Sequence, residues 1–139
     1  GFDYVYDKEL LDRLKSGHLD NIKGWINYTS SFSKNLCRFI ENHDDNRATS
    51  FFGFDISKST TAAVITYTLP GLRFVFQDQW NGYKNKLDVH LRRSFYENVN
   101  QENKEFYDKF LPIISHEIFK NGNWEFLNIE GSDSWRLIK

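Results

Sequence analysis

The chain has 139 residues, of which 40% are hydrophobic and 17% aromatic, and this length and composition suit a globular protein with a buried core. Its 18 basic and 19 acidic residues give a formal net charge of -1, which argues against a nucleic-acid-binding surface. No apolar run approaches the roughly 18 residues that a membrane span requires. No signal peptide is present either, although a missing N-terminus would have carried one away. Methionine is absent even at position 1, as expected of a chain that does not begin where its gene begins.

The N-terminal part predicts a short strand followed by two helices. Residues 2–6 are aromatic and β-branched, as in a strand, and Asp7 is well placed to cap the next helix. The leucines of that helix share one face: Leu10, Leu11 and Leu14. A Ser-Gly pair ends it, and residues 19–26 predict a second helix with Trp25 buried.

Two more strands, with a helix between them, are expected in the middle of the chain. Residues 36–41 form the near-continuous apolar run that a parallel strand covered on both faces requires. Residues 72–76 follow a Pro-Gly stop and predict the third strand. The pattern of residues 60–68 fits either a strand or a helix. A helix is expected there, because a right-handed crossover must join two parallel strands and no other segment is available.

Some apolar side chains near these strands are expected to be buried. The single cysteine, Cys37, rules out an internal disulfide and lies within an apolar run. It is expected to be a small buried hydrophobe, with a catalytic thiol as the alternative. The connection over residues 48–57 carries three aromatic side chains that are expected to plug the apolar interior: Phe51, Phe52 and Phe54.

The C-terminal third predicts a loop, a helix and a hairpin. Residues 77–103 show little periodicity and are long enough to be a functional loop. Residues 104–119 have apolar residues at helical spacing, with Pro112 as an expected kink. Residues 124–129 and 134–138 then predict a β-hairpin across a Glu-Gly-Ser-Asp turn.

The second predicted strand runs without a break into a polar loop, over the stretch Phe39-Ile40-Glu41-Asn42-His43-Asp44-Asp45-Asn46-Arg47. A junction between a buried strand and a polar loop is a favoured place for chemistry. The composition fits equally well a strand followed by a solvated turn, with Asn42 or Asp44 capping what comes next.

The pattern Phe-x-Glu-Asn-His-Asp-x-x-Arg resembles the fourth conserved region of the α-amylase family of retaining α-glycosidases and transglycosylases, at the end of the seventh strand of a (β/α)8 barrel. The resemblance implies that His43 and Asp44 hold the sugar ring in the catalytic subsite, and that Asp44 stabilises the transition state. Arg47 could orient Asp44 or keep it ionised. Glu41 is either a support for these residues or simply an acid at the end of the strand.

The flanking sequence extends this resemblance over nearly the whole chain. Residues 1–14 are similar to the family's sixth strand and the helix after it, and residues 68–79 to the eighth strand and the preceding helix end. Gln77 or Gln79 must serve there for the family's Gly-Gln pair, because the glycine is missing. Residues 106–127 are similar to the last barrel helix and the first strand of the small β domain. A Tyr-Asp-Lys run and a Leu-Asp-Val-His-Leu run suggest the maltosyltransferase-like or trehalose-synthase-like branch.

The resemblance implies an α/β fold in which residues 1–119 are the C-terminal portion of a TIM (β/α)8 barrel, comprising strands six to eight. Residues 120–139 would be the first hairpin of a small C-terminal β domain. The family's nucleophilic aspartate and acid/base glutamate would then lie upstream of Gly1. Glu41 and Asp44 are a poor substitute, because an offset of three on an extended segment directs them to opposite faces. Retaining enzymes need two carboxylates about 5–5.5 Å apart.

The expected function is a part of an α-amylase-like glycoside hydrolase or transglycosylase acting on α-linked glucans or maltooligosaccharides. The substrate-binding residues would be His43, Asn42, Arg47, Gln77, Gln79, Trp80 and Tyr83, with Asp44 in the catalytic role. Trp80 and Tyr83 are candidate platforms for sugar stacking, or else loop anchors packed on the barrel rim. The expected partners are the substrate and either the rest of the barrel or further copies of the chain, joined through exposed strands.

Two alternatives stay open. One is a non-catalytic carbohydrate-binding or interaction module that keeps the motif but performs no chemistry. The other is a metal site at His43, Asp44 and Asp45, where crowding within three residues allows few ligands to converge on one ion. No cofactor is expected, and calcium could be bound elsewhere in the parent enzyme.

Overall fold

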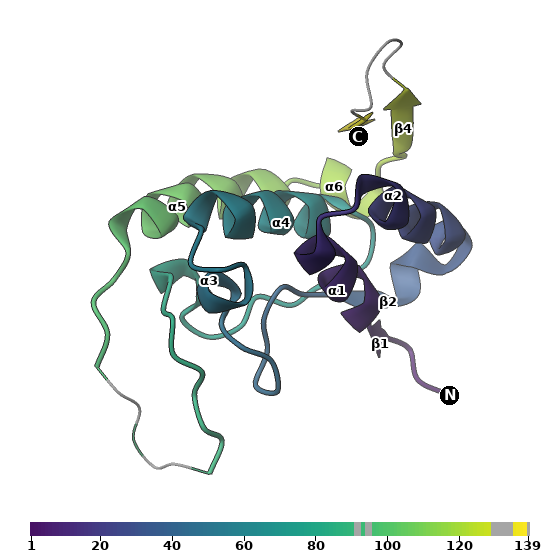
Figure 1. The fold of residues 1–139 in the computed structure, drawn as a ribbon. Helices are drawn as coiled ribbons and strands as arrows, with labels where there is room; N and C mark the ends of the chain where they lie inside the picture. The colour runs from purple at the N-terminus through teal and green to yellow at the C-terminus, as the bar shows by residue number, and fades with distance from the viewer. Residues whose placement is uncertain (91–92, 94–95, 129–134, 139) are drawn as a thin grey trace.

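The computed structural model describes residues 1–90, 93, 96–128 and 135–138. Within them, helices pack over a small parallel sheet, as Figure 1 shows. The sheet has three strands in chain order: β1 (Val5–Tyr6), β2 (Leu36–Arg38) and β3 (Leu72–Arg73). Helices follow each strand, so the expected order β-α-β-α-β-α is confirmed.

The helical segments form groups that follow the three strands. After β1 come α1 (Lys8–Ser16), α2 (Leu19–Tyr28) and the 3-10 turn η1 (Ser30–Asn35); after β2 come α3 (Ala48–Phe51) and α4 (Ile56–Thr68); after β3 come η2 (Gln79–Asn81), α5 (Gln101–Ile114) and α6 (Ile118–Asn121). Figure 1 shows α4 and α5 running side by side, and the two helices contact each other. No helix in the described part of the chain is long and apolar enough to cross a membrane.

All three strands are shorter than the sequence predicts. The ladder pairs Tyr6 with Cys37 and Cys37 with Leu72, so β2 lies between two strands of two residues each. Pairing continues one residue further, where the Asp7 amide donates to the Cys37 carbonyl and the Phe74 amide to the Arg38 carbonyl. β2 ends at Arg38, and the residues that follow it, 39–41, are not part of the ladder although they are buried. The apolar run therefore predicts burial correctly and strand length incorrectly.

Side-chain caps fix where the main helices begin. The Asp7 carboxylate accepts a hydrogen bond from the Leu10 amide, as its position predicted, and Gly17 ends α1 with a φ of 72°. Asp55 and Asn100 cap α4 and α5 in the same way. Such caps satisfy amide groups that have no partner within the first helical turn.

The ambiguous segment over residues 60–68 is helical, which confirms the crossover argument and rules out the strand. The helix α4 begins four residues earlier than expected, because Asp55 caps it. The predicted helix over residues 104–119 is divided instead into α5 and α6, with a break at residues 115–117. Pro112 lies within the last turn of α5, and the helix ends two residues later.

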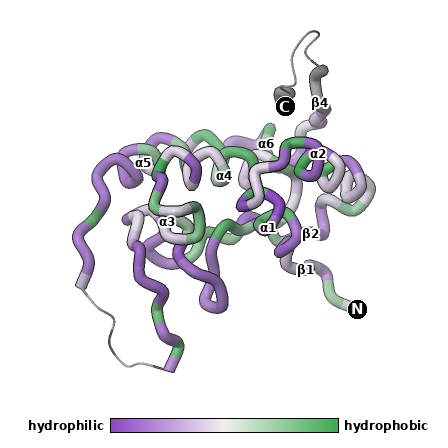
Figure 2. The backbone as a smooth tube through the Cα atoms, in the orientation of Figure 1, coloured by the Kyte–Doolittle hydropathy of each residue, from purple (hydrophilic) through white to green (hydrophobic). Residues whose placement is uncertain are grey.

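One apolar core joins the helices to the sheet. Its members include Leu10, Leu11, Ile22, Phe39, Ile40, Ala63, Tyr67, Leu69, Tyr107 and Phe110. Cys37 is buried beside it. Trp25, predicted to be buried, is only partly buried, and its indole N–H donates to the buried Asp7 carboxylate at 2.9 Å. In Figure 2 the long segment between η2 and α5 is mostly hydrophilic, which fits its place outside this core.

Of the three predicted apolar plugs, Phe51 and Phe52 are buried, and Phe54 is 63% exposed. The expectation for Phe54 is wrong because Gly53 and Phe54 both adopt positive φ, at 74° and 64°. The turn they form directs the Phe54 ring towards solvent.

The predicted hairpin is confirmed in its described part. Antiparallel strands β4 (Glu125–Asn128) and β5 (Trp135–Ile138) pair Glu125 with Ile138 and Asn128 with Trp135. The expected turn over residues 130–133, and the outer strand residues 129 and 134, lie outside the described residues.

Candidate active site

The loop that carries the motif, residues 42–47, leaves the sheet at the carboxyl end of its middle strand. Parallel strands bring the loops that follow them to the same edge of a sheet, which is where ligands bind in α/β proteins. Two contacts between these loops show this convergence. Lys8, after β1, lies 3.5 Å from the Asp45 carboxylate, and the Gln77 carbonyl, after β3, accepts a bond from Arg47.

The Asn42 side chain stabilises the turn in this loop. Its side chain is buried, and its amide oxygen accepts hydrogen bonds from the backbone amides of Asp44 and Asp45, both at 2.8 Å. This is the local turn that asparagine side chains favour. Because its oxygen is already bonded, Asn42 sets the loop conformation rather than presenting that oxygen to a ligand.

His43 and Asp44 lie together on the outside of the same loop. The His43 Nε2 atom is 3.3 Å from the Asp44 carboxylate, and the two side chains are 50% and 77% exposed. Both line a pocket of about 390 Å³ whose other lining residues are Lys86, Leu87, Asp88, Val89 and His90. The structure therefore brings the two most strongly implied sugar-binding residues together in an accessible place.

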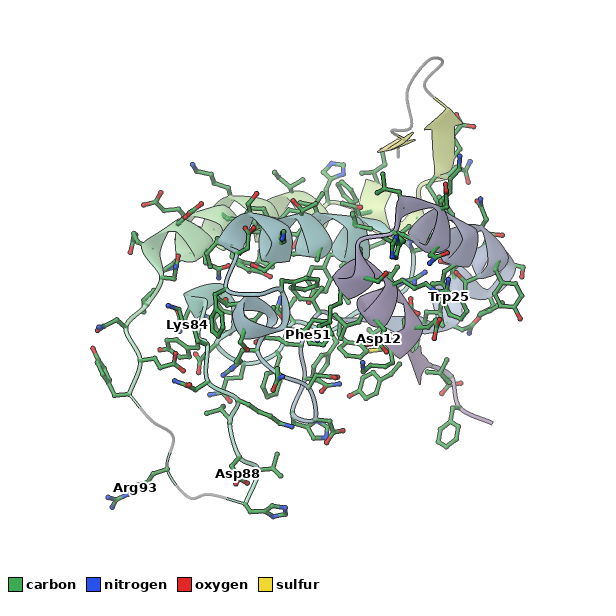
Figure 3. The ribbon with its side chains drawn as sticks, viewed as in Figure 1. Asp12, Trp25, Phe51, Lys84, Asp88 and Arg93 are labelled. Carbon is green, nitrogen blue, oxygen red and sulfur yellow. The ribbon has the colours of Figure 1, made fainter. Side chains whose placement is uncertain are left out.

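The segment over residues 84–90 contributes to this pocket. It lies within residues 77–103, which the sequence predicts as a loop long enough to be functional, but sequence reasoning named none of residues 86–90 as site residues. Lys86 donates from its ammonium group to the Asp44 carbonyl oxygen. The Glu97 carboxylate accepts hydrogen bonds from the backbone amides of Lys84 and Asn85, at 2.8 and 3.0 Å, and so ties the two sides of the long loop. Figure 3 shows Asp88 on this loop, away from the helices. In the sequence, residues 87–91 indicate only a branch similarity, and nothing in their pattern predicts a contact with Asp44.

Arg47 does not take the place that the sequence suggested for it. Its guanidinium group bonds to the Glu41 carboxylate at 2.7 Å, and not to Asp44. Both side chains of this pair are only 2% exposed. Burial raises the pKa of Glu41, and the Ala48 amide and Arg47 oppose that shift. This arrangement corrects the expectation that Arg47 orients Asp44, because a buried carboxylate needs a charged partner more than an exposed one does.

The two glutamines have different surroundings. The Gln77 side chain is exposed at the edge where the loops gather. Gln79 is 3% exposed, and its side-chain amide bonds to the hydroxyls of Tyr67 and Tyr107 and to the Phe76 amide. Gln79 therefore joins α4, α5 and the loop after β3 from inside the protein.

The two candidate sugar platforms are both half-buried. Trp80 packs against the core, and its carbonyl accepts a hydrogen bond from the Asn103 side chain at 3.0 Å. The Tyr83 ring lies 5.9 Å from the Arg47 guanidinium carbon. Trp80 is thus placed as a loop anchor, while Tyr83 lies close to the motif.

The tyrosines around Gln79 give a prediction for alkaline pH. Burial raises the pKa of Tyr67 and Tyr107 above the ordinary value of 10.0, so the folded chain keeps both protons where the unfolded chain loses them. Stability is therefore complete below pH 10 and falls as the pH rises further, by about 1.4 kcal/mol per pH unit for each tyrosine. Tyrosinate absorbance and circular dichroism, followed together, should show two tyrosines ionising only as the chain unfolds. Ionisation of Tyr67 and Tyr107 in a chain that stays folded would contradict this.

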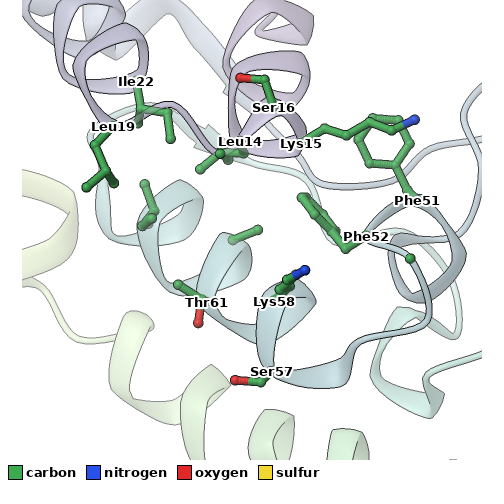
Figure 4. A pocket seen from close by; sticks show the side chains of 14 residues that line it. Leu14, Lys15, Ser16, Leu19, Ile22, Phe51, Phe52, Ser57, Lys58 and Thr61 are labelled. Atoms are coloured by element: carbon green, nitrogen blue, oxygen red, sulfur yellow. The ribbon is translucent and has the colours of Figure 1, made fainter.

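A second, larger pocket lies away from the motif, between α1, α2, α3 and α4, as Figure 4 shows. Its volume is about 500 Å³, and its walls are mainly apolar, with Leu14, Phe52 and Ile65 among them. Of the described residues that line it, only Lys15 and Lys58 are charged. Neither a carboxylate nor a candidate site residue is among these described lining residues, so they offer no chemistry for glycosidic bonds.

The alternative of a metal site finds no support in the described part of the chain. There, no group of three histidine, cysteine, aspartate or glutamate side chains could hold a metal ion, and this includes His43, Asp44 and Asp45. Asp45 is drawn towards Lys8, while Asp44 faces His43. The Asp45 carboxylate therefore lies apart from the His43–Asp44 pair, and the three side chains do not converge on one point.

No family model matches the chain. It is 33% identical over 85 residues to Alpha-amylase 3 of Dictyoglomus thermophilum, a match that covers 60% of the chain and 17% of that protein. The chain thus spans about a sixth of this relative's length.

Two solved enzyme structures have a similar fold. The cyclic alpha-maltosyl-(1->6)-maltose hydrolase from Arthrobacter globiformis, in complex with maltose, matches with a TM-score of 0.74 at 13% identity. The alpha-amylase from H. orenii matches with a TM-score of 0.67 at 20% identity. Each match covers 92% of this chain, and 33% and 35% of those chains. The sequence relative and these two folds confirm the resemblance to the α-amylase family that the Phe-x-Glu-Asn-His-Asp-x-x-Arg motif carries.

Proposed function

We propose that residues 1–119 are the C-terminal portion of an α-amylase-like (β/α)8 barrel, and that residues 120–139 begin a small C-terminal β domain. Three parallel strands, each followed by helices, support this, as does the coverage of about a third of two α-amylase-family enzymes. On this proposal the chain takes part in cleavage or transfer of glycosidic bonds in α-linked glucans. The maltose bound to one of the two structural neighbours supports a carbohydrate substrate.

The observation that carries the proposal is the pair His43 and Asp44, exposed in one pocket at the carboxyl end of the middle strand. Glycosidic cleavage passes through an oxocarbenium-like transition state that carries positive charge. A fixed carboxylate such as that of Asp44 stabilises this charge, and an imidazole N–H of His43 can donate to a sugar hydroxyl. Gln77 and Tyr83, at the same edge, are further contacts for the sugar.

The remaining candidate residues act through the loops and not on the sugar. Asn42, Arg47 and Gln79 are buried, and each is bonded within the protein. They hold the loops that present His43, Asp44 and Gln77. Trp80 belongs to the same supporting set, because its indole packs on the core.

On this proposal the nucleophile and the acid/base would be supplied by the fourth and fifth strands of the barrel, which residues 1–119 do not include. The isolated 139-residue chain is therefore expected to show no turnover of maltose, maltooligosaccharides or an activated α-glucoside. A chain extended to include the upstream strands should turn these substrates over. Release of reducing sugar measures both, and turnover by the isolated chain would contradict the proposal.

The second candidate function is a non-catalytic carbohydrate-binding module, favoured by the same absence of the two catalytic positions. The extended chain separates the two functions. A module would bind maltooligosaccharides in a calorimetric titration and yet release no product, whereas the enzyme would do both.

A further inference from the structure

A buried ion pair lies directly beneath His43 and Asp44. Glu41 and Arg47 stand on either side of the five residues 42–46, and their side chains meet at 2.7 Å with 2% exposure each. The second carboxylate oxygen of Glu41 accepts a hydrogen bond from the Ala48 amide at 2.5 Å. One carboxylate therefore holds both the start and the end of the exposed segment.

The same guanidinium group also reaches the neighbouring loop. The Arg47 Nη1 atom donates to the Gln77 carbonyl at 2.7 Å. Its guanidinium carbon lies 5.1 Å from the centre of the Phe76 ring and 5.9 Å from that of Tyr83. Arg47 thus connects the loop after β2, with His43 and Asp44, to the loop after β3, with Gln77 and Tyr83.

Stability alone is a poor reason for such a pair. Taking two charges out of water costs free energy that their attraction barely repays, and well-packed apolar residues often replace a buried pair without loss. In this case two donors of Arg47, Nε and Nη2, have no hydrogen-bond partner among the described residues, which adds to that cost. What an ion pair supplies, and an apolar pair does not, is directional bonding that fixes geometry.

We propose that Glu41 and Arg47 are positioning residues, which fix the His43–Asp44 segment in place and in register with the loop after β3. The functional meaning of this inference rests on the proposed glycosidase role of His43 and Asp44. Asn42 shapes the turn itself, and the ion pair sets where that turn stands relative to Gln77 and Tyr83.

A matched control exists in the same sheet. Asp7, at the start of α1, and Arg38, on β2, form another buried ion pair. Their side chains are 1% and 0% exposed. Glu41→Gln and Asp7→Asn each replace a buried carboxylate by an amide of the same shape. Both variants lose stability, because each leaves an arginine without its charged partner. Only Glu41→Gln acts on the segment with His43 and Asp44.

The first test is amide hydrogen exchange on the purified chain, measured for both variants at denaturant concentrations that equalise their stability. Glu41→Gln should speed exchange of the Asp44 and Asp45 amides about tenfold more than Asp7→Asn does, since losing one such bond favours local opening. Equal protection of these two amides in both variants would overturn the proposal. If Glu41→Gln fails to fold, Arg47→Lys serves instead. It keeps the charge but not the planar fork, and should still speed exchange of the Asp44 and Asp45 amides more than Asp7→Asn does.

The second test uses the extended, active chain and separates geometry from stability. Glu41→Gln should lower kcat about tenfold or more while KM changes less, because a displaced Asp44 loses contact chiefly in the transition state. Asp7→Asn should leave kcat of the folded enzyme unchanged. An equal loss of kcat in both variants would mean that the pair is merely structural. Faster exchange in a chain that has no activity would instead count against the glycosidase proposal alone.

Discussion

The variant Asp44→Asn, made in a chain that includes the upstream strands, should lose about a hundredfold or more of its maltooligosaccharide turnover, while substrate binding falls much less. The amide keeps the size and the hydrogen-bonding oxygen of the carboxylate but not its charge. The charge matters most where positive charge develops on the sugar, so its loss acts on the chemical step rather than on the ground state. Steady-state kinetics with a calorimetric Kd measure the two effects separately.

Asp45→Asn is the matched control for this variant. Asp45 is the next residue, and its carboxylate lies near Lys8 rather than beside His43. Its backbone amide bonds to Asn42 in the same way as that of Asp44. Turnover of Asp45→Asn should stay near that of the parent chain. Near-normal turnover of Asp44→Asn would refute the role proposed for Asp44.

The order of the elements followed from the sequence because it depends on local patterns and one topological rule. An apolar run predicted β2, and Asp7 predicted the start of α1. The crossover rule predicted that α4 is a helix, although its pattern fitted either a helix or a strand. Strand length could not be predicted in this way. It depends on how many residues of the neighbouring strands offer partners, and β1 and β3 offer two each.

The partners of buried polar groups were the main error at the candidate site. Arg47 was expected beside Asp44, only three residues away, but it pairs with Glu41. The sequence did contain a signal for the Glu41–Arg47 pair. Glu41 directly follows an apolar strand, where an acidic side chain is often buried, and a buried carboxylate needs a positively charged partner. No comparable signal existed for Gln79, whose partners Tyr67 and Tyr107 lie on two different helices.

The second large effect concerns the association state of the isolated chain. β1 and β3 lie at the edges of the sheet, and each has a strand partner on one side only. Large apolar side chains at these strands and before them are exposed, including Phe2, Tyr4, Val5, Tyr6 and Leu72. Open edges with apolar surface are templates for pairing with another chain. The isolated chain is therefore expected to associate with copies of itself through these strands.

A pair of lysine variants locates this association. Val5 is 51% exposed on the edge strand β1, and Val64 is 40% exposed on α4. A lysine on an edge strand opposes pairing with further strands. Val5→Lys should therefore shift the chain towards monomer, and Val64→Lys should not. Equal effects of the two variants would indicate association through the helices.

Light scattering on the purified 139-residue chain, with an apolar dye added in parallel, tests most directly whether these strands belong to an incomplete barrel. The proposal predicts particles larger than one chain, or a chain that binds the dye and melts without cooperativity. A monodisperse monomer that melts cooperatively and leaves no apolar surface open to the dye would show that the three strands form a complete unit and that the barrel proposal is wrong.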